Sequence, residues 1–278
     1  MTDSTGNDFR MVNRTRIYAV SYLNSRALTY GLEHGGLDHG FEILYDIPSE
    51  CARQVRTGGA PAGVIPSIEY ARAGAAYAIV PEIAIASDGP VASILLFHRM
   101  PVHRIRKVAM DASSRTSVAL ARIVLHERYG IEIDSFDHPP DVSAMLERAD
   151  AALVIGDPAL EYTDRPEPRV DLGEAWQELT GLPFVYAFWA GKDGGLTPAE
   201  VERLIASKEQ GVSALDEIAE LHAGNRSRPT SFYASYLKDN LAYDLGDRER
   251  NGLMEFYGLA HARGLIPEVP ELRFYPRQ

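Results

Sequence analysis

Cysteine is nearly absent from this chain of 278 residues, with Cys51 the only one. A single thiol excludes an internal disulfide and any metal site built from cysteines. No motif surrounds Cys51, so we interpret it as a packed or surface thiol rather than a nucleophile. The eight histidines show no HExxH or HxH spacing. His98 and His138 could act as bases, but lone histidines are more often structural.

Positive charge is also scarce, because 28 Lys and Arg face 39 Asp and Glu, for a formal net charge of −11. Nucleic acid and anionic membranes are therefore poor candidate partners. The balance also argues weakly against an anionic substrate, although a local cationic site or a helix terminus could overcome it. No run of about 18 apolar residues is present, so we expect no membrane-spanning helix.

Several common motifs are missing too. There is no GxGxxG, no Walker loop and no GxSxG elbow, so nothing indicates a dinucleotide fold, a P-loop or an α/β-hydrolase. The first sixteen residues, MTDSTGNDFRMVNRTR, lack the apolar stretch of a secretory signal. We therefore expect a cytoplasmic protein with a short disordered start.

What the sequence does contain is an alternation of strand and helix patterns. Short apolar runs that predict strands lie at 16–20, 41–48, 62–66, 76–87, 90–99, 107–111, 152–160 and 183–191. Helical patterns separate them, and the chain is helical in pattern from Thr197 almost to its end. The segment TPAE at 197–200 predicts a capping box at the start of a helix. This alternation predicts an α/β fold.

At four points an apolar strand meets a hydrogen-bonding residue just before a helix. These junctions are VSYLN with Ser21 and Asn24, AGVIP before Ser67, KVAMD before the run Ser113 to Ser117, and ALVIG before Asp157. Such residues are preferred helix caps, which is one interpretation. The other is a ligand site, because open α/β sheets bind ligands at the carboxyl ends of their strands, near helix N-termini.

The junction at Ser114-Arg115-Thr116 is richer than a cap requires. An Arg in the first turn of a helix opposes the helix dipole, and it is easier to explain if it pairs with an anion. An exposed Arg on a solvated face is the alternative. Ser93, inside an apolar strand, could line a cleft or be buried and satisfied by the backbone. Residue patterns alone thus predict an α/β protein that binds a small anion in a cleft.

Five segments, in this order, carry a family resemblance: VSYLN (20–24), IPSIEYAR (65–72), SDGPVASILLF (87–97), DASSRTSVALAR (111–122) and IGDPAL (155–160). Together they resemble the chorismate dehydratases of the futalosine route to menaquinone. The resemblance runs from about residue 16 to the last helix. The sister 1,4-dihydroxy-6-naphthoate synthases open with an SPCPND-like segment, which this chain lacks. It departs from the pattern at Ser25-Arg26-Ala27, where Thr and Pro flanking a basic residue are expected, and this should leave Asn24 in place.

The resemblance implies an α/β, two-lobed type II periplasmic-binding-protein-like fold with a ligand cleft between the lobes. Lobe one would comprise 1–98 plus 192–278, and lobe two 99–191. The chain would cross between them near His98–Pro101 and Phe188–Lys192. All four junctions would then face the cleft.

The implied reaction is the dehydration of chorismate to 3-[(1-carboxyvinyl)oxy]benzoate, catalysed by a carbon–oxygen lyase without a metal or an organic cofactor. Chorismate is a dianion, and the resemblance assigns Ser114, Arg115 and Thr116 to one of its carboxylates. Asn24 and Ser93 are assigned to the reacting centre. The remaining assigned substrate contacts are Ser21, Ser67 and Asp157.

The proton acceptor remains open, because neither Asn24 nor Ser93 is a strong base. One hypothesis is that the enolpyruvyl carboxylate of the substrate takes the C3 proton itself, and Asp157 is the best protein alternative. Two other functions share the fold. They are a non-catalytic cytoplasmic binding protein for a small carboxylate and the sister 1,4-dihydroxy-6-naphthoate synthase. The sequence predicts no oligomeric state.

Overall fold

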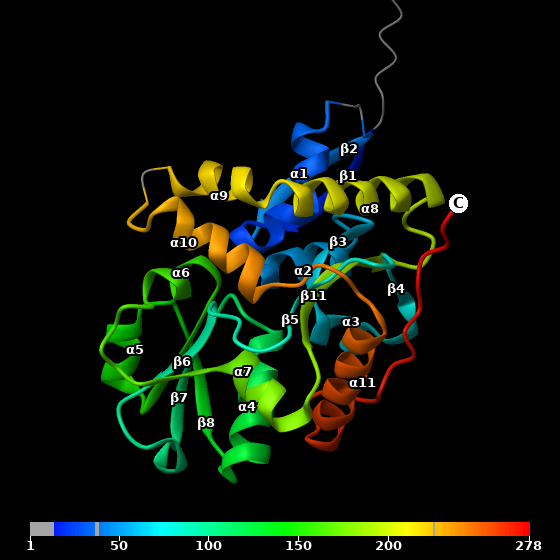
Figure 1. Ribbon diagram of the computed structural model, residues 1–278. Helices are drawn as coiled ribbons and strands as arrows, with labels where there is room; N and C mark the ends of the chain where they lie inside the picture. The colour runs from blue at the N-terminus through cyan, green and yellow to red at the C-terminus, as the bar shows by residue number, and fades with distance from the viewer. Residues whose placement is uncertain (1–13, 37–38, 225) are drawn as a thin grey trace, which may run out of the picture.

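The computed structural model describes residues 14–36, 39–224 and 226–278 (Figure 1). Most of the polar segment that we expected to be a disordered start lies outside the described residues. The chain builds two β-sheets with helices around them, which confirms the predicted α/β class.

The first sheet holds six strands, in which β1 lies between β2 and β3 and pairs parallel with both. Its members are β2 (Phe41–Asp46), β1 (Thr15–Val20), β3 (Ala62–Pro66), β11 (Phe184–Lys192), β4 (Tyr77–Ile79) and β5 (Ile85–Ser87). β11 runs antiparallel to β3, β4 and β5. Because β1 and β3 are parallel, the residues that follow them emerge at the same edge of the sheet.

The second sheet holds five strands, and β7 pairs parallel with β8 and β9. In spatial order they are β10 (Arg169–Asp171), β6 (Ile94–His98), β9 (Ala151–Ile155), β7 (Lys107–Asp111) and β8 (Asp134–His138). The segments after β7 and β9 therefore share one edge as well. Strands β3, β6 and β9 are buried along their whole length, which explains their continuous apolar sequence.

Helices cover both sheets and build most of the C-terminal third. They are α1 (Arg26–His34), α2 (Pro48–Thr57), α3 (Ser67–Ala73), α4 (Thr116–Tyr129), α5 (Val142–Arg148), α6 (Gly156–Glu161), α7 (Leu172–Thr180), α8 (Pro198–Ser213), α9 (Leu215–Ala223), α10 (Thr230–Ser235) and α11 (Asp247–Ala262). Thr197 and Glu200 form the predicted capping box of α8. The short turns are η1 (Leu23–Ser25), η2 (Gly74–Ala76), η3 (Val102–Arg104) and the π-helical η4 (Tyr236–Asn240).

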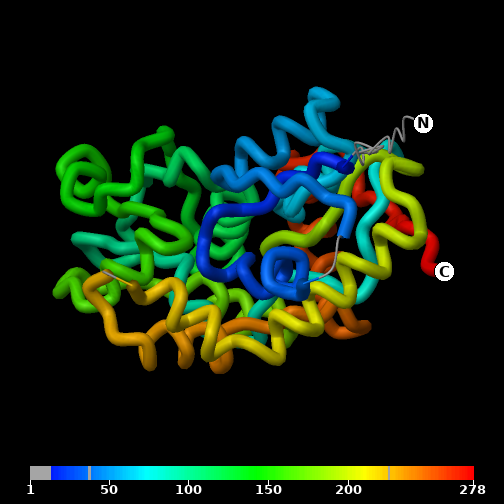
Figure 2. Tube along the Cα trace, turned by 90° about the horizontal axis from the view of Figure 1, so that it is seen from above, coloured from blue at the N-terminus to red at the C-terminus, as the bar shows by residue number. Residues whose placement is uncertain are grey.

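The two sheets occupy different parts of the molecule. The first sheet, with α1, α2 and α8, forms the upper part of Figure 1, and the second sheet, with α4, α5 and α7, forms the lower part. Seen from above, α2 lies on the rear face and α9 and α10 lie on the front face (Figure 2). None of the helices in the described ranges is long and apolar enough to span a membrane.

The chain changes sheet at different points from those expected. β6 pairs with β9 and β10 in the second sheet, so the first change falls between Ser87 and Ile94 rather than near His98. β11 belongs wholly to the first sheet, so the return precedes Phe184. An apolar run predicts a strand but not the sheet that receives it, so the sequence does not fix these positions. The residue boundaries of the two lobes stay a prediction, and sheet membership favours boundaries at 88–93 and 181–183.

The first crossover is fixed by a carboxylate of the second sheet. Ala92 adopts a φ of 60°, a left-handed conformation that is rare for residues other than glycine. The two carboxylate oxygens of Asp171 accept hydrogen bonds from the backbone N–H groups of Val91 and Ala92, at 3.0 and 2.7 Å. These bonds offset the cost of the strained backbone at the crossover.

Candidate active site

A pocket lies between the two sheets, where the edges that follow β1, β3, β7 and β9 face each other. It has a volume of about 50 Å³. Its lining residues are Val20, Tyr22, Asn24, Pro48, Pro66, Ile85, Ile94, Ser114, Arg115, Thr116, Ser117, Ile155, Gly156, Tyr186 and Ala187. All four predicted junctions contribute to this wall. The junction after β1 contributes Asn24, the one after β3 contributes Pro66, the one after β7 contributes Ser114–Ser117, and the one after β9 contributes Gly156.

The start of α4 provides the strongest anion site in this pocket. Among the described residues, no side chain caps this helix. The Ser114 hydroxyl is buried and has no hydrogen-bond partner in the described part of the chain. Free N–H groups and the helix dipole at a helix start favour negative charge, so an anion placed here would also satisfy the Ser114 hydroxyl.

Arg115 lines the same pocket, but its side chain is turned onto its own loop. Its Nη1 donates to the carbonyl oxygens of Ala112 and Ser114, at 3.2 and 2.8 Å. Within the described ranges no carboxylate pairs with this guanidinium. A cation without an acidic partner, beside an uncapped helix, can pair with a carboxylate ligand.

Thr116 and Ser67 connect the two parts of the molecule. The Thr116 hydroxyl lines the pocket and accepts a hydrogen bond of 3.2 Å from the Ile68 N–H. The Ser67 hydroxyl is fully buried and donates to the Val185 carbonyl at 2.8 Å. Ser67 is not among the residues that line the pocket, so its hydrogen-bonding capacity is used to join α3 to β11.

Asn24 and Ser93 meet through a tyrosine that sequence reasoning missed. Asn24 lines the pocket, and its Oδ1 is buried without a partner in the described residues. The hydroxyl of Tyr236, in η4, donates to Ser93 Oγ at 2.8 Å. Burial raises the Tyr236 pKa, while hydrogen bonds with Ser93 and Asn24 oppose the rise. Ser93 is fully buried and is not among the residues that line the pocket.

Asp157 bridges the two parts of the molecule and is not among the lining residues. Its Oδ1 accepts a hydrogen bond of 2.8 Å from the Leu23 N–H, and its Oδ2 lies 3.5 Å from Arg226 Nη2 and 3.7 Å from His222 Nε2. Burial raises the Asp157 pKa, against the influence of the Leu23 N–H and the Arg226 cation. Ser21 also lies outside the pocket lining, and its N–H donates to the Asp46 carbonyl at 2.9 Å.

Two further tyrosines line the pocket. Tyr22 shares a hydrogen bond of 3.0 Å with Ser113, and burial raises the pKa of Tyr22 to about 12. Tyr186 shares a hydrogen bond of 2.8 Å with Ser87, and its pKa is raised by burial as well. Tyr22 lies within the VSYLN motif and could have been found there. Tyr236 carries no sequence signal, since it lies in the helical C-terminal third.

The solved structures to which the chain is similar share its fold. A protein of Archaeoglobus fulgidus matches with a TM-score of 0.76 at 18% identity, covering 91% of this chain and 99% of that one. The periplasmic aliphatic sulphonate binding protein SsuA of Escherichia coli matches with a TM-score of 0.68 at 17% identity, covering 96% and 93%. These matches confirm the predicted two-lobed, periplasmic-binding-protein-like fold.

Sequence comparison gives the family. The chorismate dehydratase of Thermus thermophilus is 29% identical over 255 residues, which cover 85% of this chain and 91% of that relative. A sequence profile for a family described as menaquinone biosynthesis matches residues 15–262. The chain therefore belongs to the menaquinone biosynthesis family.

Proposed function

We propose that this protein is a chorismate dehydratase, which converts chorismate to 3-[(1-carboxyvinyl)oxy]benzoate and water in the cytoplasm, in the futalosine route to menaquinone. The observation that carries the proposal is the uncapped start of α4 with the unpartnered Ser114 hydroxyl, inside the pocket between the sheets. Membership of the menaquinone biosynthesis family and the similarity to a chorismate dehydratase support the same reaction.

The reaction removes the hydroxyl group from C4 of the ring and the hydrogen from C3, and these leave together as water. The electron pair of the C3–H bond completes the aromatic ring, so the reaction is strongly downhill. The C3 hydrogen is acidified by conjugation to the ring carboxylate. The protein therefore has to hold the dianion, stabilise charge that grows on the ring carboxylate and help hydroxide to leave.

The α4 start supplies the carboxylate site. One substrate carboxylate accepts hydrogen bonds from the free N–H groups of α4 and from the Ser114 and Thr116 hydroxyls, and Arg115 turns from its loop carbonyls to pair with it. The N–H groups and the two hydroxyls are fixed by the fold before the charge develops, so only Arg115 has to reorient. The predicted contacts of Ser21 and Ser67 stay predictions.

Asn24 and Tyr236 serve the leaving hydroxyl. Asn24 lines the pocket with an unpartnered Oδ1, so it has free hydrogen-bonding capacity to orient the ring or the C4 hydroxyl. Tyr236 positions Asn24, and Ser93 acts through Tyr236 because it is not among the residues that line the pocket. No strong base lines the pocket at these residues, which favours the enolpyruvyl carboxylate of the substrate as the acceptor of the C3 proton. We assign Asp157 a bridging role, since its oxygens contact Leu23 and lie near Arg226.

The test is incubation of the purified protein with chorismate, followed by liquid chromatography and mass spectrometry. Loss of one water with an aromatic ultraviolet spectrum would establish the dehydratase. Arg115→Ala should then raise KM, and Asn24→Ala should lower kcat. A substrate in which the enolpyruvyl carboxylate is a neutral amide should not turn over; normal turnover would exclude the substrate as base. Unchanged chorismate would overturn the enzyme assignment and favour a carboxylate-binding protein of the same fold.

A further inference from the structure

A second cavity, the rear cavity, is lined in part by residues of α2. Helix α2 lies on the rear face of the molecule (Figure 2). The rear cavity has a volume of about 630 Å³ and is lined by Ala52, Arg56, Ile65, Glu69, Arg72, Ala73, Ala76, Tyr77, Arg115, Lys192 and Asp193. That volume is in the range of small-molecule sites. Arg115 lines both cavities, so one guanidinium is shared between them.

The rear cavity is lined by more cationic side chains than carboxylates. Arg56 and Arg72 share one carboxylate, that of Glu69, at 3.6 and 2.7 Å. Asp193 pairs with Arg273, which lies outside the lining, at 3.2 Å. No carboxylate in the described part of the chain pairs with Arg115 or Lys192.

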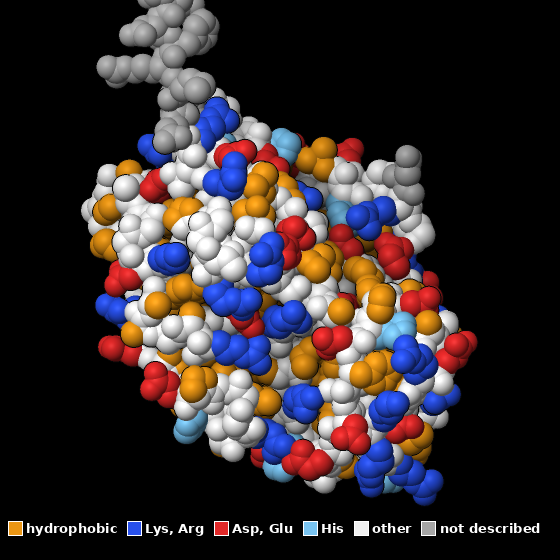
Figure 3. All heavy atoms as spheres, turned by 180° about the vertical axis from the view of Figure 1, so that it is seen from behind, with side chains coloured by type: hydrophobic (Ala, Val, Ile, Leu, Met, Phe, Trp, Pro, Cys, Tyr) orange, Lys and Arg blue, Asp and Glu red, His pale blue; other side chains and the backbone are white. Residues whose placement is uncertain are grey.

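This excess of cations is unusual for the chain as a whole, which has 39 acidic and 28 basic residues. Carboxylates are abundant, yet none neutralises Arg115 or Lys192 at the rear cavity. Figure 3 shows Lys and Arg side chains gathered on the middle of the rear face. A local surplus of cations on an acidic protein attracts and holds small anions.

The floor of the rear cavity adds an apolar surface and one free hydroxyl. Ala52, Ile65 and Ala73 contribute alkyl groups, and Tyr77 contributes its ring. Tyr77 is only 6% exposed, and its hydroxyl makes no hydrogen bond to the described residues. A hydroxyl without a protein partner, in a cavity that is also lined by Arg and Lys, is free to donate to a ligand that enters.

We infer that the rear cavity is a second binding site for a ring-bearing dicarboxylate, the chemical class of the proposed substrate and product. The ring packs on the apolar floor, one carboxylate pairs with Lys192 and the Tyr77 hydroxyl, and the other faces Arg72. The choice of ligand class rests on the proposed function, while the unbalanced charge does not. Because Arg115 lines both cavities, a ligand in the rear cavity competes for the cation that serves the pocket.

The test uses 3-(carboxymethoxy)benzoate, which carries the ring and both carboxylates but cannot react. Calorimetric titration of the wild-type protein should resolve two sites. Lys192→Gln and Tyr77→Phe should each weaken one site by roughly fivefold to tenfold and leave the other unchanged. The weakened site should also be the more sensitive to salt.

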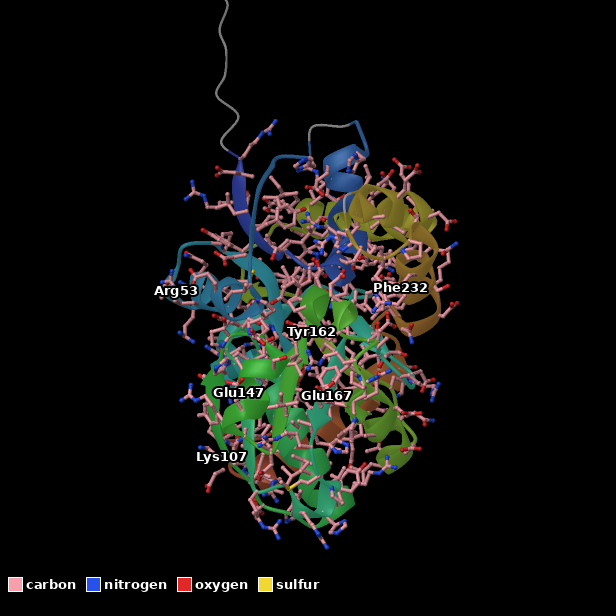
Figure 4. All side chains as sticks on the ribbon, turned by 90° about the vertical axis from the view of Figure 1, so that its left-hand side faces the viewer. Arg53, Lys107, Glu147, Tyr162, Glu167 and Phe232 are labelled. Atoms are coloured by element: carbon pink, nitrogen blue, oxygen red, sulfur yellow. The ribbon has the colours of Figure 1, made fainter. Side chains whose placement is uncertain are left out.

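The matched control for Lys192→Gln is Arg53→Gln, which also removes one positive charge but from α2 rather than from β11. Arg53 pairs with Glu50 and is not among the residues that line the rear cavity. In Figure 4 it projects outward from the edge of the molecule, on the side opposite Phe232. This variant should keep both sites and the wild-type turnover.

Three results would overturn the inference: a single site in the wild-type protein, wild-type titrations in both variants, or displacement of the probe by equimolar inorganic phosphate. The last would show that the cavity recognises charge alone. Failure of the proposed function has a different signature, since chorismate would then remain unchanged while two probe sites persist. With active enzyme, the product should inhibit the wild type in a mixed pattern and the Lys192→Gln variant competitively.

Discussion

The ring of Tyr22 lies against the backbone of Gly156, so that a Cβ at position 156 would come within 2.4 Å of the ring atom Cδ2. Tyr22 follows β1 of the first sheet and Gly156 follows β9 of the second. Gly156 also has a φ of +63°, which favours glycine. The two parts of the molecule can approach this closely only because residue 156 has no side chain, and both residues line the pocket.

Gly156→Ala should therefore damage activity far more than stability. The added methyl group displaces Tyr22 and shifts the two pocket walls, and misplacement by about 1 Å can cost on the order of a hundredfold in kcat/KM. The measurement is kcat/KM with chorismate beside a thermal unfolding curve.

Gly130→Ala is the matched control for that variant. Gly130 has a φ of +65° at the far end of α4, and a Cβ there would meet nothing within 4 Å. The Gly130→Ala variant should have the same backbone strain as Gly156→Ala, on the order of 1 kcal/mol, but should keep its turnover. Equal loss of turnover in both variants would show that strain, rather than the contact with Tyr22, causes the effect.

Ser114→Ala and Ser67→Ala should separate binding from stability. The Ser114 hydroxyl has no partner in the described residues, so its removal should leave the free energy of unfolding unchanged. KM should rise roughly tenfold or more, because a hydrogen bond to a charged carboxylate is lost. Ser67 donates to Val185, so Ser67→Ala should cost about 1 kcal/mol of stability and change KM less than twofold. Urea unfolding measures the change in stability, and steady-state kinetics measure the change in KM. If KM rose for Ser67→Ala and stability fell for Ser114→Ala, the carboxylate site would lie at α3 instead.

These two serines also show what the sequence could and could not predict. Both follow an apolar strand and precede a helix, and the same pattern assigned both to the substrate. Only the tertiary structure shows that a neighbouring strand uses one hydroxyl and leaves the other free. The pattern does not encode the partner, because β11 lies more than a hundred residues from Ser67 in the chain.

The strands themselves could be predicted, because continuous apolar runs such as AGVIP are buried on both faces. The sheet that receives each strand could not be predicted, and the strand within SILLFH, which was expected in lobe one, pairs with β9 and β10 of the second sheet. Tyr236 was missed because its contact with Ser93 spans 143 residues. Local patterns therefore give the elements and the junctions, while long-range pairing decides which side chains reach the pocket.

Tyr236→Phe should lower kcat roughly tenfold with little change in KM, because Asn24 loses the hydroxyl that positions it. If Ser93 acts only through Tyr236, adding Ser93→Ala to Tyr236→Phe should cause no further loss. Tyr70→Phe is the control, since it also removes the hydroxyl of a fully buried tyrosine but one that donates to Glu271, away from the pocket. Additive losses for Tyr236 and Ser93 would give Ser93 a separate role at the reacting centre.

Acid should weaken the protein through His222, which packs edge-on against Tyr233 beside Asp157. Burial and the nearby Arg226 and Arg26 cations lower the pKa of His222 to about 4, although Glu161 opposes this. An unfolded histidine binds its proton at about pH 6.5. Between pH 6.5 and pH 4 the unfolded chain therefore holds more protons than the folded one. Stability that is fully present above pH 6.5 is lost as the pH falls toward 4, by at most about 3 kcal/mol.

His222→Gln should remove this loss, so the difference in unfolding free energy between variant and wild type should change in that pH window and be flat above pH 7. Burial also raises the pKa of Asp111 and Asp171. Both groups titrate in the wild type and in the variant, so their contributions to stability cancel in the difference between the two. Arg226→Gln should shrink the loss, because one cation that disfavours protonated His222 is removed. A difference that is flat from pH 4 to pH 8 would contradict the prediction, because it would mean that His222 binds its proton equally well in the folded and the unfolded chain.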